Sequence, residues 1–270
     1  MGKLSLTDYE AVKIPVPWGY ISGRWYGNRK ERPILGIHGW LDNLGSFDRL
    51  IPLLPDYIGV LCIDLPGHGR SSHLQSGMNY KKQLLNVERQ RLGNYSEPPS
   101  YTLPQLGKVM AQGSFNSVSP DLAKHLLHRQ LTKSQLYPER FYFSRDIRVK
   151  YYHYMDIDDG LGAEMARQIH KKPYLIIKGS LSPYLPARNN EAISILAKDN
   201  PHFEFYEVEG GTHHLHLHAA EECATYIVPF IQHHRPPALN SWTITGNGDN
   251  NIGKKPKGFL AWTKKKRSKL

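Results

Sequence analysis

Short apolar runs separated by glycine, proline and polar residues fill the N-terminal part of the chain. Val12 to Val16 and Tyr20 to Tyr26 flank Trp18-Gly19, and this spacing predicts the two strands of a hairpin. Pro33 precedes a further apolar run, Ile34 to His38, which predicts the first parallel strand of a sheet.

The residues that follow predict a helix and a second parallel strand. Phe47 to Leu54 carry apolar residues at helical spacing, with Ser46 as the expected N-cap before Asp48. Tyr57 to Ile63 has the apolar character of a buried strand. Strand, helix and strand in this order indicate a βαβ unit and therefore a mostly parallel sheet.

Polar, helix-forming sequence interrupts this rhythm between Asn79 and Tyr137. Tyr95 to Ser100 is typical of a connection, and Asp121 to Arg129, with Leu131 beyond it, is amphipathic at the helical period. Helices inserted in a sheet protein indicate a cap or lid. Two aromatic-rich segments follow, and their side chains either line the underside of that cap or, the favoured alternative, pack in an ordinary core. These segments are Phe141 to Asp146 and Val149 to Tyr154.

The sheet pattern returns towards the C-terminus. The expected strands are Pro173 to Lys178 and Phe203 to Val208, and the expected helices are Leu161 to Ile169, Asn190 to Lys198 and Ala219 to His233. Pro236-Pro237 mark the expected end of the folded part.

Composition adds few constraints, because 270 residues with 40% hydrophobic and 22% charged side chains are ordinary for a soluble globular protein. No run of about 18 apolar residues predicts a transmembrane segment, and the N-terminus shows no secretory signal. Cys62 and Cys223 cannot form a disulfide framework. We expect two buried free thiols in a reducing, intracellular compartment.

The formal net charge of +11 is concentrated near the C-terminus, where eight basic residues fall between Lys254 and Lys269. Residues 236–270 therefore predict a basic flexible tail, and binding to nucleic acid or anionic lipid is the disfavoured alternative. The tail ends in Ser268, Lys269 and Leu270, a tripeptide that the peroxisomal import receptor reads. We expect a peroxisomal location, with the cytoplasm as the alternative.

Four motifs together resemble one protein family. They are Val16-Pro17-Trp18-Gly19, His38 to Asn43 with Ser46 to Leu54, Gly67 to His73, and Gly211-Thr212-His213. On these motifs the chain resembles the serine hydrolase-like proteins of the α/β-hydrolase superfamily, strongly over residues 12–75 and less so over 100–235. The resemblance implies an α/β-hydrolase fold, a mostly parallel sheet with helices on both faces and a helical cap. It also implies hydrolysis of an ester or related acyl bond in a small-molecule substrate; no cofactor is expected.

The resemblance assigns two catalytic groups. His213 follows the last expected strand, where this fold places its general base, and an imidazole can take the serine proton and return it to the leaving group. The backbone N–H of Trp40, after His38-Gly39, is expected to form half of an oxyanion hole. Three more histidines raise zinc as an alternative, disfavoured because no carboxylate or cysteine lies at matching spacing. They are His214, His216 and His218.

The nucleophile is missing, because no serine lies in the Gly-x-Ser-x-Gly elbow that this fold uses. Four serines close to glycines are expected to satisfy backbone groups in turns and caps: Ser71, Ser72, Ser114 and Ser180. The acid is unassigned as well. The loop after Tyr174 to Lys178 offers Asn189, Asn190 and Glu191 but no aspartate.

Tyr80 passes directly into Lys81-Lys82 where the family continues to its nucleophile strand, so the central strands are absent from the sequence. A splice variant or an incomplete gene model would explain this. We expect the N-terminal core at 1–80, a helical cap at 81–155, the C-terminal core at 156–235 and then the tail. The chain is expected to be inactive as an esterase. The alternative is a non-catalytic pseudo-enzyme or binding protein that pairs with an intact copy through its bare strands.

Overall fold

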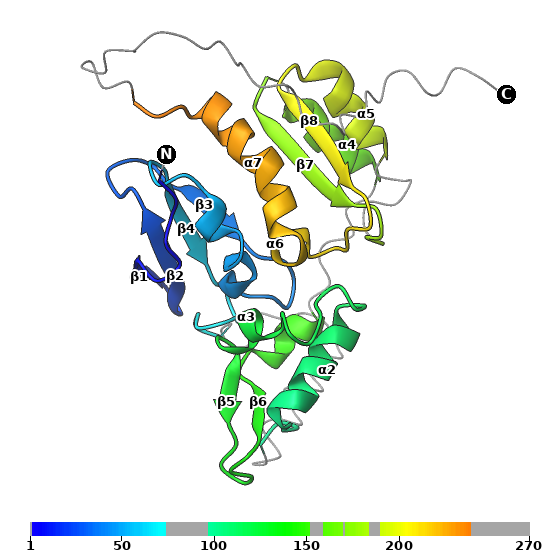
Figure 1. Ribbon diagram of the computed structural model, residues 1–270. Helices are drawn as coiled ribbons and strands as arrows, with labels where there is room; N and C mark the ends of the chain where they lie inside the picture. Colours follow the sequence, from blue (N-terminus) through cyan, green and yellow to red (C-terminus); the bar gives the residue numbers. More distant parts are fainter. Residues whose placement is uncertain (1, 74–96, 152–158, 170, 184–189, 239–270) are drawn as a thin grey trace, which may run out of the picture. The chain divides into compact units, whose positions relative to one another are not determined.

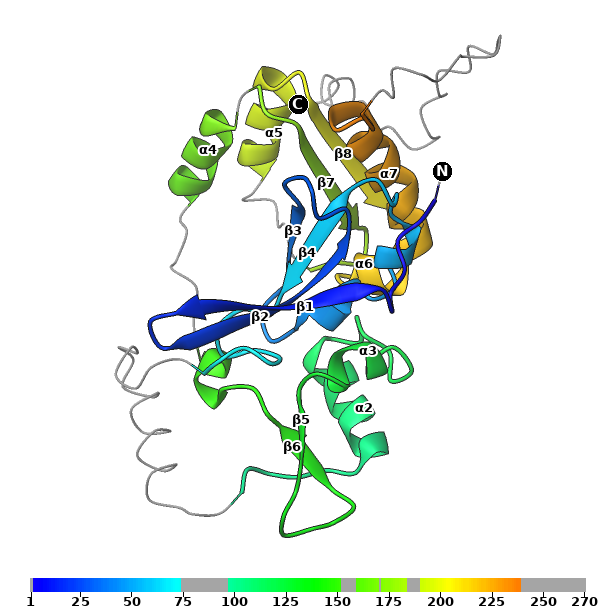
Figure 2. The same ribbon diagram turned by 90° about the vertical axis from the view of Figure 1, so that its left-hand side faces the viewer.

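The computed structural model describes residues 2–73, 97–151, 159–169, 171–183 and 190–238 (Figure 1, Figure 2). It divides into two compact units, Met1–Tyr154 with His216–His218, and Met155–Leu215 with Ala219–Leu270. The junction at Tyr80 to Lys82 and the C-terminal tripeptide lie outside the described residues, and the predictions made for them remain predictions.

A four-stranded sheet in the order β1-β2-β4-β3 forms the frame of the first unit. β1 (Tyr9–Val16) and β2 (Gly19–Gly27) form the predicted hairpin. β4 (Gly59–Ile63) pairs antiparallel with β2 and parallel with β3 (Ile34–Ile37). β4 has a neighbouring strand on each side, and its Val60 and Cys62 are buried.

The helix predicted over Phe47 to Leu54 is wrong. Two 3-10 helices replace it, η1 (Leu44–Phe47) and η2 (Ile51–Leu53). Pro52 explains the break, because a proline inside a continuous α-helix removes one backbone donor and clashes with the preceding turn. The predicted N-cap Ser46 lies buried within η1, whereas Asn43 caps η1 by accepting a 2.9 Å hydrogen bond from the Gly45 N–H.

The rest of the first unit contains α2 (Leu103–Gly113), α3 (Lys124–Leu127), η3 (Ile147–Tyr151) and a hairpin of β5 (Leu131–Lys133) with β6 (Phe141–Phe143). The core cluster here consists of Leu106, Val118, Ala123, Leu126, Leu127 and Leu217. Phe141 and Phe143 pack against this cluster, so the core alternative is confirmed for both side chains.

Two details of this region differ from the prediction. The helix expected over Asp121 to Arg129 is limited to the four residues of α3, because Leu122 and Ala123 are held in a turn by the Ser119 carbonyl. Leu131 was expected to extend the helix, but it pairs with Phe143 in a hairpin that the sequence pattern did not predict.

The second unit is a βαβ unit with flanking helices. β7 (Tyr174–Gly179) and β8 (Phe203–Val208) are parallel and are joined through α5 (Asn190–Asp199). In Figures 1 and 2 the strand pair lies between α7 (Ala220–His234) on one side and α5 with α4 (Asp159–Gln168) on the other. These strands and helices were predicted to within about two residues. The sequence pattern missed α6 (Leu215–His218), most of which belongs to the first unit.

Both cysteines are buried free thiols, as predicted. Burial raises the pKa of Cys62 to about 12 and that of Cys223 to about 11, so both remain protonated and unreactive near neutral pH.

Candidate active site

The candidate site of the first unit is the turn that follows β3. Gly39 accepts a 3.2 Å hydrogen bond from the Asp42 N–H, and Leu41 adopts a positive φ of 63°. Trp40 lies in this turn, 44% exposed, and its indole Nε1–H donates a 2.7 Å hydrogen bond to the Val149 carbonyl. Within the part of the chain that the structure describes, the backbone N–H of Trp40 donates no hydrogen bond. The oxyanion role of this amide remains a prediction.

His38 connects this turn to the loop that follows β4. Its Nε2 accepts a 2.9 Å hydrogen bond from the Leu65 N–H, and its Nδ1 lies 2.7 Å from the Gly39 carbonyl. The carbonyl can only accept, so Nδ1 carries the proton and the ring is neutral. Burial lowers the pKa of His38, in agreement with a neutral ring. Both nitrogens are engaged, which gives His38 a structural role.

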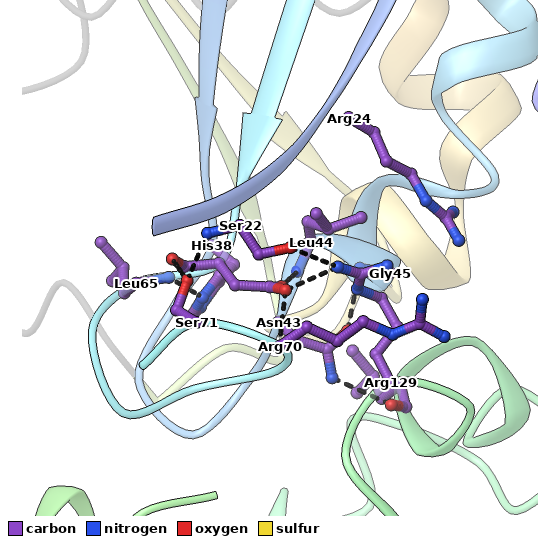
Figure 3. Close-up of polar contacts among 12 residues, drawn as sticks. Ser22, Arg24, His38, Asn43, Leu44, Gly45, Leu65, Arg70, Ser71 and Arg129 are labelled. Carbon is purple, nitrogen blue, oxygen red and sulfur yellow. Dashed lines mark hydrogen bonds and ion pairs between the residues drawn. The ribbon is translucent and has the colours of Figure 1, made fainter. Parts of the chain in front are cut away.

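Asp64 directly follows β4, and its buried carboxylate accepts hydrogen bonds from both loops. Figure 3 labels its partners Leu44, Arg70 and Arg129. Its Oδ1 accepts a 2.9 Å hydrogen bond from the Leu44 N–H, and its Oδ2 accepts from the Arg70 N–H at 2.9 Å and from the Arg129 guanidinium at 2.6 Å. Leu44 follows β3, Arg70 follows β4 and Arg129 follows α3. The carboxylate thus fixes three separate segments in the part of the molecule that carries Trp40.

A glycine turn permits this arrangement. Gly69 has a φ of +50°, and a Cβ at this position would lie 2.3 Å from the Asp64 carboxyl carbon. Only glycine fits this conformation without strain. The Gly67-His68-Gly69 motif found in the sequence is therefore explained by close wrapping around Asp64.

His68, inside that turn, is the second buried histidine. Its ring centroid lies 5.1 Å from that of His38, and its Nδ1 donates to the Pro66 carbonyl at 3.0 Å. Burial lowers the pKa of His68 to about 4, so the ring is neutral at physiological pH. Its Nε2 is buried and has no hydrogen-bond partner among the described residues.

Ser71, Ser72, Ser114 and Ser180 each satisfy backbone groups, as predicted. The Ser71 hydroxyl donates to the Asp64 carbonyl at 2.6 Å and accepts from the Ser22 N–H at 2.8 Å. Ser72 accepts from the Tyr20 N–H, and Ser180 accepts from the Gly210 N–H. Ser114 donates to the Ala111 carbonyl and accepts from the Val118 N–H. These four hydroxyls therefore stabilise the backbone of the fold.

A separate candidate site lies within the second unit and follows β8. His213 is exposed, and its Nδ1 lies 3.3 Å from the Ser182 hydroxyl. The ring of His214 meets that of His213 edge-on at 5.2 Å. The structure describes no group of three or more histidine, cysteine, aspartate or glutamate side chains placed to hold a metal ion, within the residues it covers.

Sequence reasoning did not single out three residues that the structure brings to these loops: Asp64, Arg129 and Ser182. Asp64 carried one usable signal, since a lone carboxylate that directly follows an apolar strand needs a partner. Arg129 and Ser182 carried none, because their contacts join segments that are far apart in the sequence.

Comparison with known proteins supports the fold. No family model matches the chain. A thioesterase domain from the curacin biosynthetic pathway superposes with a TM-score of 0.62 at 15% identity, covering 83% of this chain and 100% of that one. A hypothetical protein of Pseudomonas aeruginosa gives 0.63 at 19% identity, covering 84% and 100%. An E-2-(acetamidomethylene)succinate hydrolase gives 0.60 at 15%, covering 83% and 99%. The chain has the α/β-hydrolase fold.

Proteins of related sequence match parts of this chain. A probable serine hydrolase of Drosophila melanogaster is 53% identical over 73 residues, which are 27% of this chain and 22% of the relative. Serine hydrolase-like proteins of Mus musculus and Danio rerio are 38% and 48% identical over 122 and 118 residues. Those matches cover 44% and 43% of this chain, and 39% and 36% of the relatives.

Over these segments the chain is similar to serine hydrolase-like proteins. It spans less than half the length of these curated relatives. No described helix is both long enough and apolar enough to cross a bilayer.

Proposed function

We propose that this chain keeps two groups of an ester-hydrolysing site but lacks the nucleophile, so that it does not turn over ester or related acyl bonds. The single observation that carries this proposal is how the serine hydroxyls are hydrogen-bonded. Ser71, Ser72, Ser114 and Ser180 hold backbone groups with their hydroxyls, and no serine of the sequence lies in a nucleophile elbow.

The retained groups define what the intact site would do. The Trp40 N–H would stabilise the oxyanion, and His213 would carry the proton from the nucleophile to the leaving group. A second oxyanion donor normally comes from the residue after the nucleophile, and it is lost together with the elbow. Without the nucleophile, only the residual effect of binding and of half an oxyanion hole is left.

The direct test is steady-state hydrolysis of short and long p-nitrophenyl esters by the purified chain, with the His213→Ala variant as a matched control. We expect the same slow background rate from both proteins. Turnover by the wild-type chain that disappears in His213→Ala would overturn the proposal.

One observation favours a binding function as the second candidate. β3 ends the sheet order, and its Leu35 and Ile37 are 50% and 55% exposed. An exposed apolar edge strand is a template for pairing with another chain. If an intact copy of the protein pairs here, mixing the two forms should give an earlier peak in size exclusion, and Ile37→Lys in this chain should abolish that peak.

A further inference from the structure

The loops after β7 and β8 are joined to each other by backbone hydrogen bonds. The Leu181 N–H donates to the Gly211 carbonyl at 2.9 Å, and the Ser180 N–H donates to the Val208 carbonyl at 3.0 Å. The Ser180 hydroxyl accepts from the Gly210 N–H at 2.9 Å. Three bonds in so short a span hold the two loops in a fixed relation.

The backbones of the two loops lie so close together at Gly179 that no side chain would fit there. A Cβ at Gly179 would lie 2.3 Å from the Gly211 carbonyl oxygen and 2.5 Å from that of Thr212. The loop then turns, with the Ser182 N–H donating to the Gly179 carbonyl at 3.0 Å. This turn brings the Ser182 hydroxyl to 3.3 Å from Nδ1 of His213.

We propose that Ser182 is a positioning residue for His213, with its hydroxyl accepting a hydrogen bond from the protonated Nδ1. The inference rests on the role of His213 as the base under the proposed function. A catalytic histidine must present an unprotonated Nε2, and a partner that accepts at Nδ1 favours that tautomer. In a Ser-His-Asp triad a carboxylate has this task.

A hydroxyl does only part of what a carboxylate does. It sets the tautomer and the ring orientation, but it has no negative charge with which to stabilise an imidazolium. The segment from Gly179 to Pro183, which supplies Ser182, contains no aspartate or glutamate. Ser182 therefore orients His213 without making it a stronger base.

Nitrogen-15 NMR of the full chain tests the tautomer. At a pH above the titration of His213 we expect the proton on Nδ1 in the wild type and on a mixture of nitrogens in Ser182→Ala. Ser182→Thr retains the hydroxyl and should restore the Nδ1 proton. A His213 tautomer that is the same in wild type and Ser182→Ala would overturn the proposal.

A second pair of variants tests proximity without removing a contact. Ser182→Asp should raise the pKa of His213 by about one unit, because a carboxylate within about 4–6 Å favours the charged ring. Ser182→Asn has the same size without the charge and should not raise it. Equal His213 titration in these two variants would also overturn the proposal. Neither measurement involves ester turnover, so its failure is distinguishable from failure of the proposed function.

Discussion

Arg129 donates a 2.6 Å hydrogen bond to the carboxylate of Asp64, and both side chains are almost completely buried. The guanidinium comes from the segment after α3 and the carboxylate from the end of β4, so the contact joins residues 65 positions apart. Together with the Leu44 and Arg70 amides, this pair holds the loops beside Trp40.

Removal of Arg129 should therefore destabilise the fold. Arg129→Met leaves a buried carboxylate without its cation and should lower the free energy of unfolding by about 3–5 kcal/mol in chemical denaturation. The matched control is Arg167→Met, which breaks solvent-exposed ion pairs with Glu164 and Glu191 and should cost less than about 1 kcal/mol. Equal losses in the two variants would contradict the role given to the buried pair.

The turn at Gly69 should tolerate no side chain. Gly69→Ala puts a Cβ against the Asp64 carboxylate in a backbone conformation with positive φ, and we expect a loss of about 1–3 kcal/mol of unfolding free energy. Gly162→Ala is the opposite case, since its Cβ would enter open space inside α4 and should stabilise the protein by about 0.5–1 kcal/mol. A neutral Gly69→Ala variant in thermal or chemical denaturation would refute the close wrapping.

His68 should make stability depend on pH. Burial lowers its pKa to about 4 from an ordinary 6.5, so between these values the unfolded chain binds a proton that the folded protein does not. Stability is consequently lost as the pH falls through this window. His68→Asn cannot bind that proton. Between about pH 7 and about pH 4, its free energy of unfolding should therefore fall by up to about 3 kcal/mol less than that of the wild type. If the free energies of unfolding of the wild type and His68→Asn changed equally with pH, the buried neutral ring of His68 would be contradicted.

Much of the fold could be predicted from the sequence because the βαβ pattern is local. Phe203–Val208 was predicted with its observed bounds, and the β1–β2 hairpin follows from the alternation around Trp18-Gly19. The pattern failed where a proline and a cap override the helical spacing. Residues 47–54 have helical spacing, but Pro52 and the Asn43 cap produce two 3-10 helices instead.

In the candidate sites, too, some features could be predicted from the sequence and others could not. Trp40, His213 and the missing nucleophile follow from motifs and from chain order, and the assigned roles of both residues stay predictions. The Asp64–Arg129 pair and the Ser182–His213 contact depend on which loops meet in space. No periodic pattern in the sequence predicts which of these loops contact each other.

The missing segment leads to a prediction about its origin. We expect transcripts of the same gene to include a longer form with a Gly-x-Ser-x-Gly elbow inserted between the codons for Tyr80 and Lys82, as in a splice variant or an incomplete gene model. Sequencing of transcripts across this junction checks it. Finding the short form alone would favour a pseudo-enzyme over a shortened enzyme.

The most direct test of the central claim is the intact mass of the purified chain after treatment with a fluorophosphonate, which reacts with activated serine hydroxyls. Since no serine of the sequence lies in a nucleophile elbow, and Ser71, Ser72, Ser114 and Ser180 bind backbone groups, we predict no adduct in the folded protein. A stoichiometric adduct that maps to one serine, and that is lost in His213→Ala, would show a working nucleophile and contradict the account.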